Sequence, residues 1–444
     1  MIKALIYRFR DNPRHFLVLA ALFHLAVTTM VFSLGRFSLM PSQFDRDGIG
    51  QFAADGHIHL GDAIQMTNVF ETEGAAAWFR TAAPLHVRAY SLTLIPLHHL
   101  FGFNIMTIEP VNLLLYLAML AIVFRLTESM FDRRAAWIAA TLVALWPTLL
   151  VHSTQPLRDP LLIVALLAFF LIMQRWLTEI FNWRQLAIIA VCGVLVLLTI
   201  WVVRLAMWDI SRVVVVLGFL LVIAGQLWKR KLAIPNLVFG LVLILAVFAI
   251  PQFNRQLQFL SKRDADNDRL LIGEKAAGLP IWERVIARRN GFINRLYDED
   301  YRAGSDIDSG VRFQNRTELI LYLPRAAAIG LWAPFPNAWF APGMLVGRTG
   351  RIISGGEMVA TYMLEVLALF GLWRARRDVF AWLLAVIAIL GVTALGLIVI
   401  NVGSLYRLRY PYWIFLAMLG AGGAVYVWSR VGARNSVRTD GVGG

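Results

Sequence analysis

The amino-acid sequence predicts an all-α, polytopic membrane protein with about ten transmembrane helices and additional juxtamembrane or re-entrant helices on its outer side. Of its 444 residues, 59% are hydrophobic and only 16% are charged, whereas soluble domains are roughly 45–50% apolar and about 25% charged. The apolar residues come in runs of about 17–22, the length that a helix needs to cross ~30 Å of hydrocarbon. These runs predict spans at 16–34, 109–126, 135–151, 160–177, 185–203, 211–228, 233–250, 356–373, 379–400 and 411–429.

Basic clusters in the short loops predict which side of the membrane each loop occupies. If the ten spans alternate, the clusters at 133–134, 229–231 and 374–377 fall on the cytoplasmic side, together with both termini. Residues 84–103 and 317–343 then do not cross. Both contain several prolines, which favours outer juxtamembrane or re-entrant helices.

This topology predicts three parts of the chain. Residues 1–250 form an N-terminal transmembrane module, with a first outer loop (35–108) and a second outer loop around 152–160. Residues 251–355 form a large outer-side loop. Residues 356–444 form the C-terminal transmembrane helices and a short cytoplasmic tail.

Composition and missing motifs narrow the possible functions. The formal charge of +14 would suggest nucleic acid in a soluble protein, but here it follows from loops beside a membrane, and we expect no nucleic-acid partner. The single cysteine, Cys192, excludes a disulfide framework. The sequence contains no phosphate-binding glycine loop, so we expect no nucleotide cofactor.

The first outer loop contains several carboxylates and imidazoles soon after a span. Any of them can act as a general base or metal ligand, although a solvated loop with helix-capping aspartates is the alternative. These residues are Asp45, Asp47, Asp55, His57, His59, Asp62, Glu71 and Glu73.

The second outer loop places Arg158 and Asp159 between two prolines at the mouth of a span. Such charges are costly beside the membrane unless they are paired or functional. A structural ion pair at the helix end is the alternative interpretation, and Asp159 followed by Pro160 also predicts a helix start.

The large loop contains a predicted amphipathic helix at 281–296. Arg284, Arg288 and Arg295 recur there at helical spacing, and guanidinium groups bind phosphate bidentately. A solvated helix among lipid headgroups is the alternative. Residues 261–275 are polar and of mixed charge, which predicts a mobile segment.

Between the last two spans, Arg407 and Arg409 alternate with tyrosines such as Tyr406. A lipid phosphate is the natural partner of these arginines, whereas an aromatic belt alone explains the tyrosines. Glu357 and Glu365 lie inside a predicted span, which leaves an ion-coupled transporter open.

The order of these segments resembles that of the C-type (GT-C) glycosyltransferase superfamily. Its members include protein O-mannosyltransferases, aminoarabinose transferases and oligosaccharyltransferase catalytic subunits. The stretch Asp55–Ala63 (DGHIHLGDA) fits the Asp-x-x-x-Tyr-x-x-x-Ala frame of the family, with His59 in place of Tyr and Gly74 downstream. The chain has no strict Asp-Asp or Asp-Glu pair, because Arg46 separates Asp45 from Asp47, so Asp55 competes with both as the base.

Four later segments match the family in order and spacing. A proline-led apolar segment ends in Phe-Gly-x-Asn, a basic turn follows, the next span ends in Pro, and a second outer loop carries Asp. Here these segments are 84–104, 131–134, 146–147 and 156–159.

The resemblance implies an inverting membrane glycosyltransferase of the bacterial inner membrane, with its active site facing the periplasm. It would transfer a sugar from a polyprenyl-phosphate donor to a lipid-linked or glycan acceptor among membrane lipids. Asp55 would be the general base. Asp159 would position Asp55 or the donor phosphate. It is also the candidate metal ligand for a divalent cation such as Mg²⁺ or Mn²⁺, which is the candidate cofactor. The expected substrate- and phosphate-binding residues are His57, His59, Arg158, Arg288, Arg289, Arg325, Tyr406, Arg407 and Arg409.

Two other functions remain open. An O-antigen-type polysaccharide polymerase or ligase is also polytopic with arginine-rich outer loops, and it would depend on Arg and His rather than on Asp55. A lipid-linked sugar flippase or transporter is the other, although the two halves of the sequence show no internal repeat.

Overall fold

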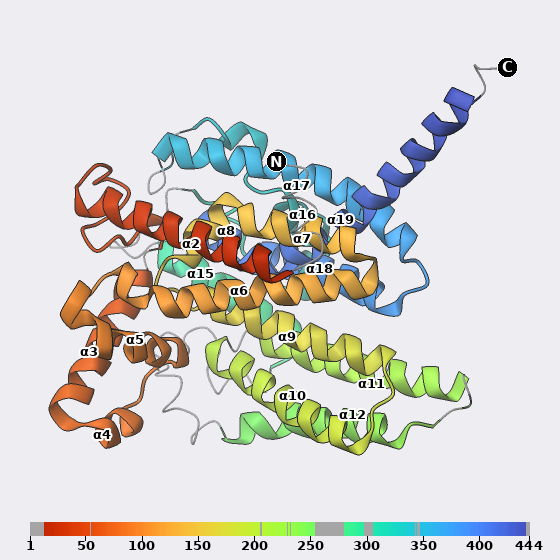
Figure 1. Ribbon diagram of the computed structural model, residues 1–444, viewed down its shortest axis with the longest axis horizontal. Coiled ribbons are helices and arrows are strands. Elements are labelled where there is room, and N and C mark those ends of the chain that lie inside the picture. Colours follow the sequence, from red (N-terminus) through yellow and green to blue (C-terminus); the bar gives the residue numbers. More distant parts are fainter. Residues whose placement is uncertain are drawn as a thin grey trace. The chain divides into compact units, whose positions relative to one another are not determined.

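The structure, a computed structural model, confirms the all-α class (Figure 1). It describes residues 13–440 except 54, 205–206, 229, 231, 254–278, 297–304, 342 and 344–346. These described residues form helices and no β-strand. The segment 261–275, for which the sequence predicts mobility, lies outside them.

Nine helices of the described residues are long and apolar enough to cross a membrane, and a bent helix pair raises this number to ten. Each contains or overlaps one predicted span, so the chain has the architecture of an integral membrane protein. The nine are α2 (Pro13–Arg36), α6 (Ile105–Met130), α9 (Asp159–Thr178), α10 (Trp183–Val203), α11 (Trp208–Trp228), α12 (Ile234–Ala249), α17 (Gly347–Arg374), α18 (Val379–Ile398) and α19 (Val402–Asp440).

The bent pair consists of α7 (Arg133–Leu145) and α8 (Pro147–Ser153), which meet at 64°. Trp146, between them, has φ −69° and ψ 113°. The ring of Pro147 disfavours helical geometry at the preceding residue, so the break follows directly from the sequence.

The two proline-containing segments form helices that do not qualify as candidate spans. They are α5 (Leu85–Phe101) and α16 (Arg316–Trp332), each of 17 residues. The predicted amphipathic helix of the large loop is confirmed as α15 (Ile281–Leu296).

The chain divides into two compact units, and this division differs from the three predicted parts. Unit 1 comprises Met1–Asp11, Val123–His152 and Asp264–Gly444, and unit 2 comprises Asn12–Ile122 and Ser153–Arg263. The segment 123–152 thus packs in one compact unit with the C-terminal helices.

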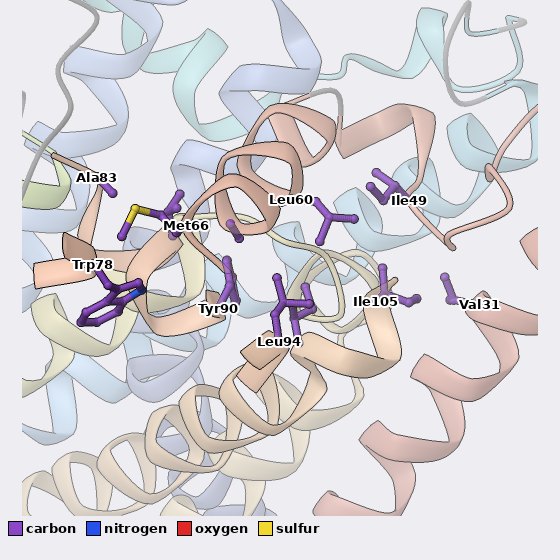
Figure 2. Packing of buried hydrophobic residues seen from close by; sticks show 12 residues of the cluster. Val31, Ile49, Leu60, Met66, Trp78, Ala83, Tyr90, Leu94 and Ile105 are labelled. Carbon is purple, nitrogen blue, oxygen red and sulfur yellow. The ribbon is translucent and has the colours of Figure 1, made fainter. Parts of the chain in front are cut away.

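In unit 2, α3 (Asp55–Glu73) packs against α5 and against the short α4 (Ala75–Arg80). Figure 2 shows the core of this region, where Leu60 and Met66 of α3 meet Tyr90 and Leu94 of α5. Complete burial of one such side chain contributes about 1.5–3 kcal/mol, so this core holds the two helices together. The helices α9, α10, α11 and α12 pack together in the same unit (Figure 1).

In unit 1, glycines allow two close helix contacts. A Cβ on Gly371 of α17 would collide with the α19 backbone, and one on Gly423 of α19 would collide with the α17 backbone. In the same way, a Cβ on Gly330 of α16 would collide with the α18 backbone, and one on Gly396 of α18 would collide with the α16 backbone. Small residues let helix backbones approach where lipid tails weaken the hydrophobic drive for association. The pairs α17–α19 and α16–α18 are therefore specified by these glycines.

Candidate functional site

Gln155 links the first loop (35–108) and the second loop (around 152–160) of unit 2. Its Oε1 accepts a hydrogen bond of 2.8 Å from the backbone N of Gly50, and its Nε2 donates to the carbonyl of Gly48 at 3.3 Å. Asn112 of α6 donates to the Gln155 carbonyl at 3.3 Å. Because Gln155 is completely buried, these bonds hold the first loop against the second.

Tyr90 of α5 supports the same junction from the other side. Its hydroxyl lies 2.7 Å from the Leu157 carbonyl oxygen and 3.1 Å from Asn112 Oδ1, and shares its one proton between them. Burial raises the pKa of Tyr90 above its ordinary value, so the hydroxyl remains a donor. The residues just before Arg158 and Asp159 are thus held in place.

Asp159 is a buried carboxylate at the first turn of α9 and forms an ion pair with Arg204. Arg204 Nη1 lies 3.2 Å from Asp159 Oδ1, and the two side chains are 17% and 9% exposed. Arg204 caps the C-terminal end of α10. Sequence reasoning missed Arg204, although its place directly after a transmembrane run was a usable signal.

The imidazole of His59 is affected by charges from both the first and the second loop. Burial is the main reason that its pKa is lowered, and Arg158 lowers it further, while Asp55, Asp62 and Asp159 act in the opposite direction. These two loops are far apart in sequence, and the fold of unit 2 brings them together. We call four of these residues, Asp55, His59, Arg158 and Asp159, the His59 cluster.

His86 of α5 completes this region, and sequence reasoning missed it. Its ring centroid lies 4.4 Å from that of His59 at an interplanar angle of 82°. Neither ring nitrogen has a hydrogen-bond partner among the described residues. Burial, and then the charges of His59 and Arg158, hold the pKa of His86 well below its ordinary value of 6.5, so a neutral ring lines the cluster.

The other first-loop aspartates serve a local turn. Asp45 Oδ1 accepts hydrogen bonds from the backbone N of Ile49 at 2.7 Å and of Asp47 at 3.0 Å. Asp45 Oδ2 lies 3.4 Å from Nδ1 of His57, whose side chain is 46% exposed. Burial, and then the charge of Asp45, raise the pKa of Asp47. This arrangement favours Asp55 over Asp45 as a base, because one Asp45 oxygen already holds two backbone amides.

Arg289 and Arg325, which the sequence suggests as phosphate ligands, both have partners within unit 1. Arg289 is buried and donates to the carbonyls of Val311, Leu397 and Asp308 at 2.8, 2.9 and 2.7 Å. Arg325 forms a two-bond ion pair with Asp308 at 3.0 and 3.3 Å. Arg289 therefore holds the backbone around Asp308, and we assign it a structural role, whereas Arg325 binds the Asp308 carboxylate with a side chain that is 49% exposed.

Arg409 and Tyr406 of α19 are also engaged within unit 1. Arg409 is buried and donates to the carbonyls of Leu331 and Ala333 at 3.0 and 2.8 Å, at the C-terminal end of α16. The Tyr406 hydroxyl donates to Glu357, whose carboxylate also accepts from Thr148. These contacts correct the expectation that Arg409 and Tyr406 are open to a substrate phosphate.

Arg288 and Arg407 are half-buried on α15 and α19, both in unit 1. Of the predicted binding residues, the structure thus groups His59 and Arg158 with Asp55 and Asp159 and places His57 beside Asp45. The remaining ones belong to unit 1.

Asp159 is not part of a metal-ligating group in the described residues. Arg204, 3.2 Å away, supplies the positive charge that a divalent cation would supply to this carboxylate. The described residues that come together in metal-ligating geometry are Glu71, His98 and His99, at the far ends of α3 and α5.

Comparison with protein-family models gives no match, and comparison with curated proteins gives none. The functional interpretation therefore rests on the side chains described above.

Proposed function

We propose that the chain is an inverting membrane glycosyltransferase that transfers a sugar from a polyprenyl-phosphate donor to a lipid-linked or glycan acceptor, with the His59 cluster as its active site. The observation that supports this most is the convergence of Asp55 and Asp159, from two separate outer loops, on the same imidazole. A carboxylate base and a cation within one cluster are what this reaction needs.

Asp55 acts as the general base in this proposal. Its carboxylate takes the proton of the acceptor hydroxyl, whose oxygen forms a bond to the anomeric carbon of the sugar. The bond between that carbon and the donor phosphate oxygen breaks, and the electron pair leaves with the polyprenyl phosphate. One displacement inverts the anomeric configuration.

Arg158 stabilises the negative charge that develops on the leaving phosphate, the usual electrostatic contribution at such a site. Asp159, held by Arg204, positions Arg158 at the start of α9. Because Arg204 already neutralises Asp159, no step is routed through a metal ion.

The test is a transfer assay with the purified protein in proteoliposomes that contain a polyprenyl-phosphate sugar and an acceptor. Asp55→Asn keeps the side-chain volume and removes the base, so transfer falls by about 10²–10⁴-fold while membrane insertion and donor binding persist. Asp62→Asn, two turns along the same helix, is the matched control and stays active. Full activity of Asp55→Asn together with loss in Asp45→Asn would move the base to Asp45.

Full activity of these three variants and of Asp47→Asn would reject a first-loop carboxylate base. If Arg288→Gln or His57→Gln alone then abolished chain growth, the polymerase or ligase function would replace the proposal.

A transporter is the second candidate, because unit 2 contains a buried ionisable pair between apolar helices. His24 Nδ1 of α2 lies 2.7 Å from Glu109 Oε1 of α6, and the two residues are 0% and 3% exposed. Thr28 and Ser153 complete this network at 2.9 Å each. Intramembrane ionisable residues often mark ion or substrate pathways. This function would be favoured if the protein translocates the lipid-linked sugar without transferring it, and if Glu109→Gln abolishes that translocation.

A further inference from the structure

We propose that Glu71, His98 and His99 form a site for a divalent transition-metal ion, Zn²⁺ being the best match, that fastens the end of α3 to the end of α5. Glu71 lies in the last turn of α3, and the two histidines lie in the last turn of α5. Asp55 begins the same α3 helix 16 residues earlier, which is roughly 24 Å along the axis. The metal site is therefore separate from the His59 cluster.

The distances from the Glu71 carboxylate to the two imidazoles match the ligand spacing of a tetrahedral zinc shell. Glu71 Oε1 lies 3.3 Å from His98 Nε2 and 3.4 Å from His99 Nε2, and one ligand atom from each residue lies within 4.8 Å of the others. Zinc bonds to N and O of about 2.0–2.1 Å at tetrahedral angles separate neighbouring ligand atoms by roughly 3.3 Å. An octahedral Mg²⁺ shell with bonds of about 2.0–2.1 Å would bring neighbouring ligand atoms closer, to roughly 2.9 Å.

The tautomer of His98 supports a cation between the ligands. His98 Nδ1 lies 2.9 Å from the Leu94 carbonyl oxygen, and a carbonyl only accepts, so Nδ1 carries the proton. In the neutral ring, Nε2 then presents a lone pair toward the Glu71 carboxylate. Two acceptors that face each other require a cation between them, or a second proton on the imidazole.

The surroundings of His98 orient the ring as in known metal sites. Ligating histidines commonly donate the other ring N–H to a carbonyl or carboxylate, which fixes the ring and the tautomer. His98 also stacks on Phe103 with centroids 4.7 Å apart and an interplanar angle of 10°. Its side chain is only 10% exposed, whereas those of Glu71 and His99 are 35% and 70% exposed. The metal thus reaches its ligands from solvent, and water takes the fourth position.

The donor set selects the class of metal. Two imidazoles and one carboxylate suit Zn²⁺ and neighbouring transition metals, whereas Mg²⁺ and Ca²⁺ prefer oxygen ligands. The competing interpretation is a histidinium–carboxylate pair without metal, in which Glu71 bridges two protonated rings.

The experiment measures metal binding by the full-length protein in detergent micelles, after chelator treatment and removal of the chelator. Zn²⁺ is titrated at pH 7.5 against a chromogenic zinc indicator, and bound metal is counted by elemental analysis. We expect one Zn²⁺ per chain and at least a tenfold preference over Mg²⁺. Glu71→Gln and His98→Gln should weaken binding at least tenfold, whereas Glu73→Gln, exposed on the same helix end, should bind as the original chain does.

Variants that misfold are recognised by size-exclusion chromatography, and those that elute normally give the result. A second readout is independent of the variants: Zn²⁺, and not Mg²⁺, should protect the amides at the ends of α3 and α5 from hydrogen exchange. Absence of stoichiometric Zn²⁺, or equal binding by Glu71→Gln and the original chain, would overturn the proposal. Asp55→Asn should lose sugar transfer but bind zinc as the original chain does, so the two proposals are tested independently.

Discussion

Replacement of His86 by Phe should remove a pH-dependent part of the stability of unit 2. Both nitrogens of this buried ring lack hydrogen-bond partners in the described residues, and its pKa lies well below 6.5 because of burial and of the nearby His59 and Arg158. The folded chain therefore keeps the ring neutral, while the unfolded chain lets it bind a proton. This contribution is present above about pH 6.5 and is lost as the pH falls.

The size of this change in the free energy of unfolding follows from the lowered pKa of His86. Between about pH 7.5 and 5.5, an unfolded histidine with an ordinary pKa of about 6.5 changes from about one-tenth to about nine-tenths protonated. If the folded ring stays neutral throughout, the free energy of unfolding falls by about 1.4 kcal/mol. The Phe variant lacks this contribution, and at pH 7.5 it should be as stable as the original chain or more so, because it buries no unsatisfied nitrogen.

The assay is a denaturant titration in mixed micelles at both pH values. The pH dependence of the original chain should exceed that of His86→Phe by about 1.4 kcal/mol, and the comparison cancels the other titrating groups. His57→Phe is the control, because the His57 side chain is 46% exposed and its loss should leave the dependence unchanged. Equal pH dependence in His86→Phe and the original chain would refute the assignment of a neutral buried ring.

The remaining predictions concern an ion pair, an anchor and the topology. Arg204→Met should lower the free energy of unfolding by about 3–5 kcal/mol, because it leaves Asp159 charged and buried, and Asp159→Asn in the same chain should recover part of that loss. Arg289→Met, which leaves three carbonyls without their charged donor, should cost about 3 kcal/mol or more; a loss below about 1 kcal/mol would contradict the anchoring role. A cysteine at position 404 should react with an impermeant thiol reagent from outside and one at position 376 should not, and labelling at 376 would reject the ten-span topology.

The helices themselves were readable from the sequence. Hydrophobic runs long enough to cross a membrane predicted every candidate span, and the 3.6-residue period predicted α15 with the bounds that the structure has. The prolines of 84–103 and 317–343 indicated that these segments do not cross, and α5 and α16 are not among the candidate spans. Such features depend on the local run of side chains and on the thickness of the bilayer, both of which one sequence contains.

The partners of the charged residues were decided by tertiary structure. Arg158 and Asp159 are neighbours in sequence, yet Asp159 forms its ion pair with Arg204, which the sequence places at the end of another helix. Arg288 and Arg289 are neighbours on α15. Of the two, Arg289 is the buried one, and it donates to three backbone carbonyls.

The sequence by itself therefore determined the class and the spans, and it singled out Asp55 and Asp159 as candidate site residues. The tertiary structure decided that Asp55, Arg158 and Asp159 act on His59, that His86 is buried beside it, and that Arg289 and Arg409 are buried against backbone carbonyls. The physical reason is that hydropathy and periodicity act along one helix, whereas a guanidinium or imidazole takes its role from groups that packing brings to it from distant parts of the chain.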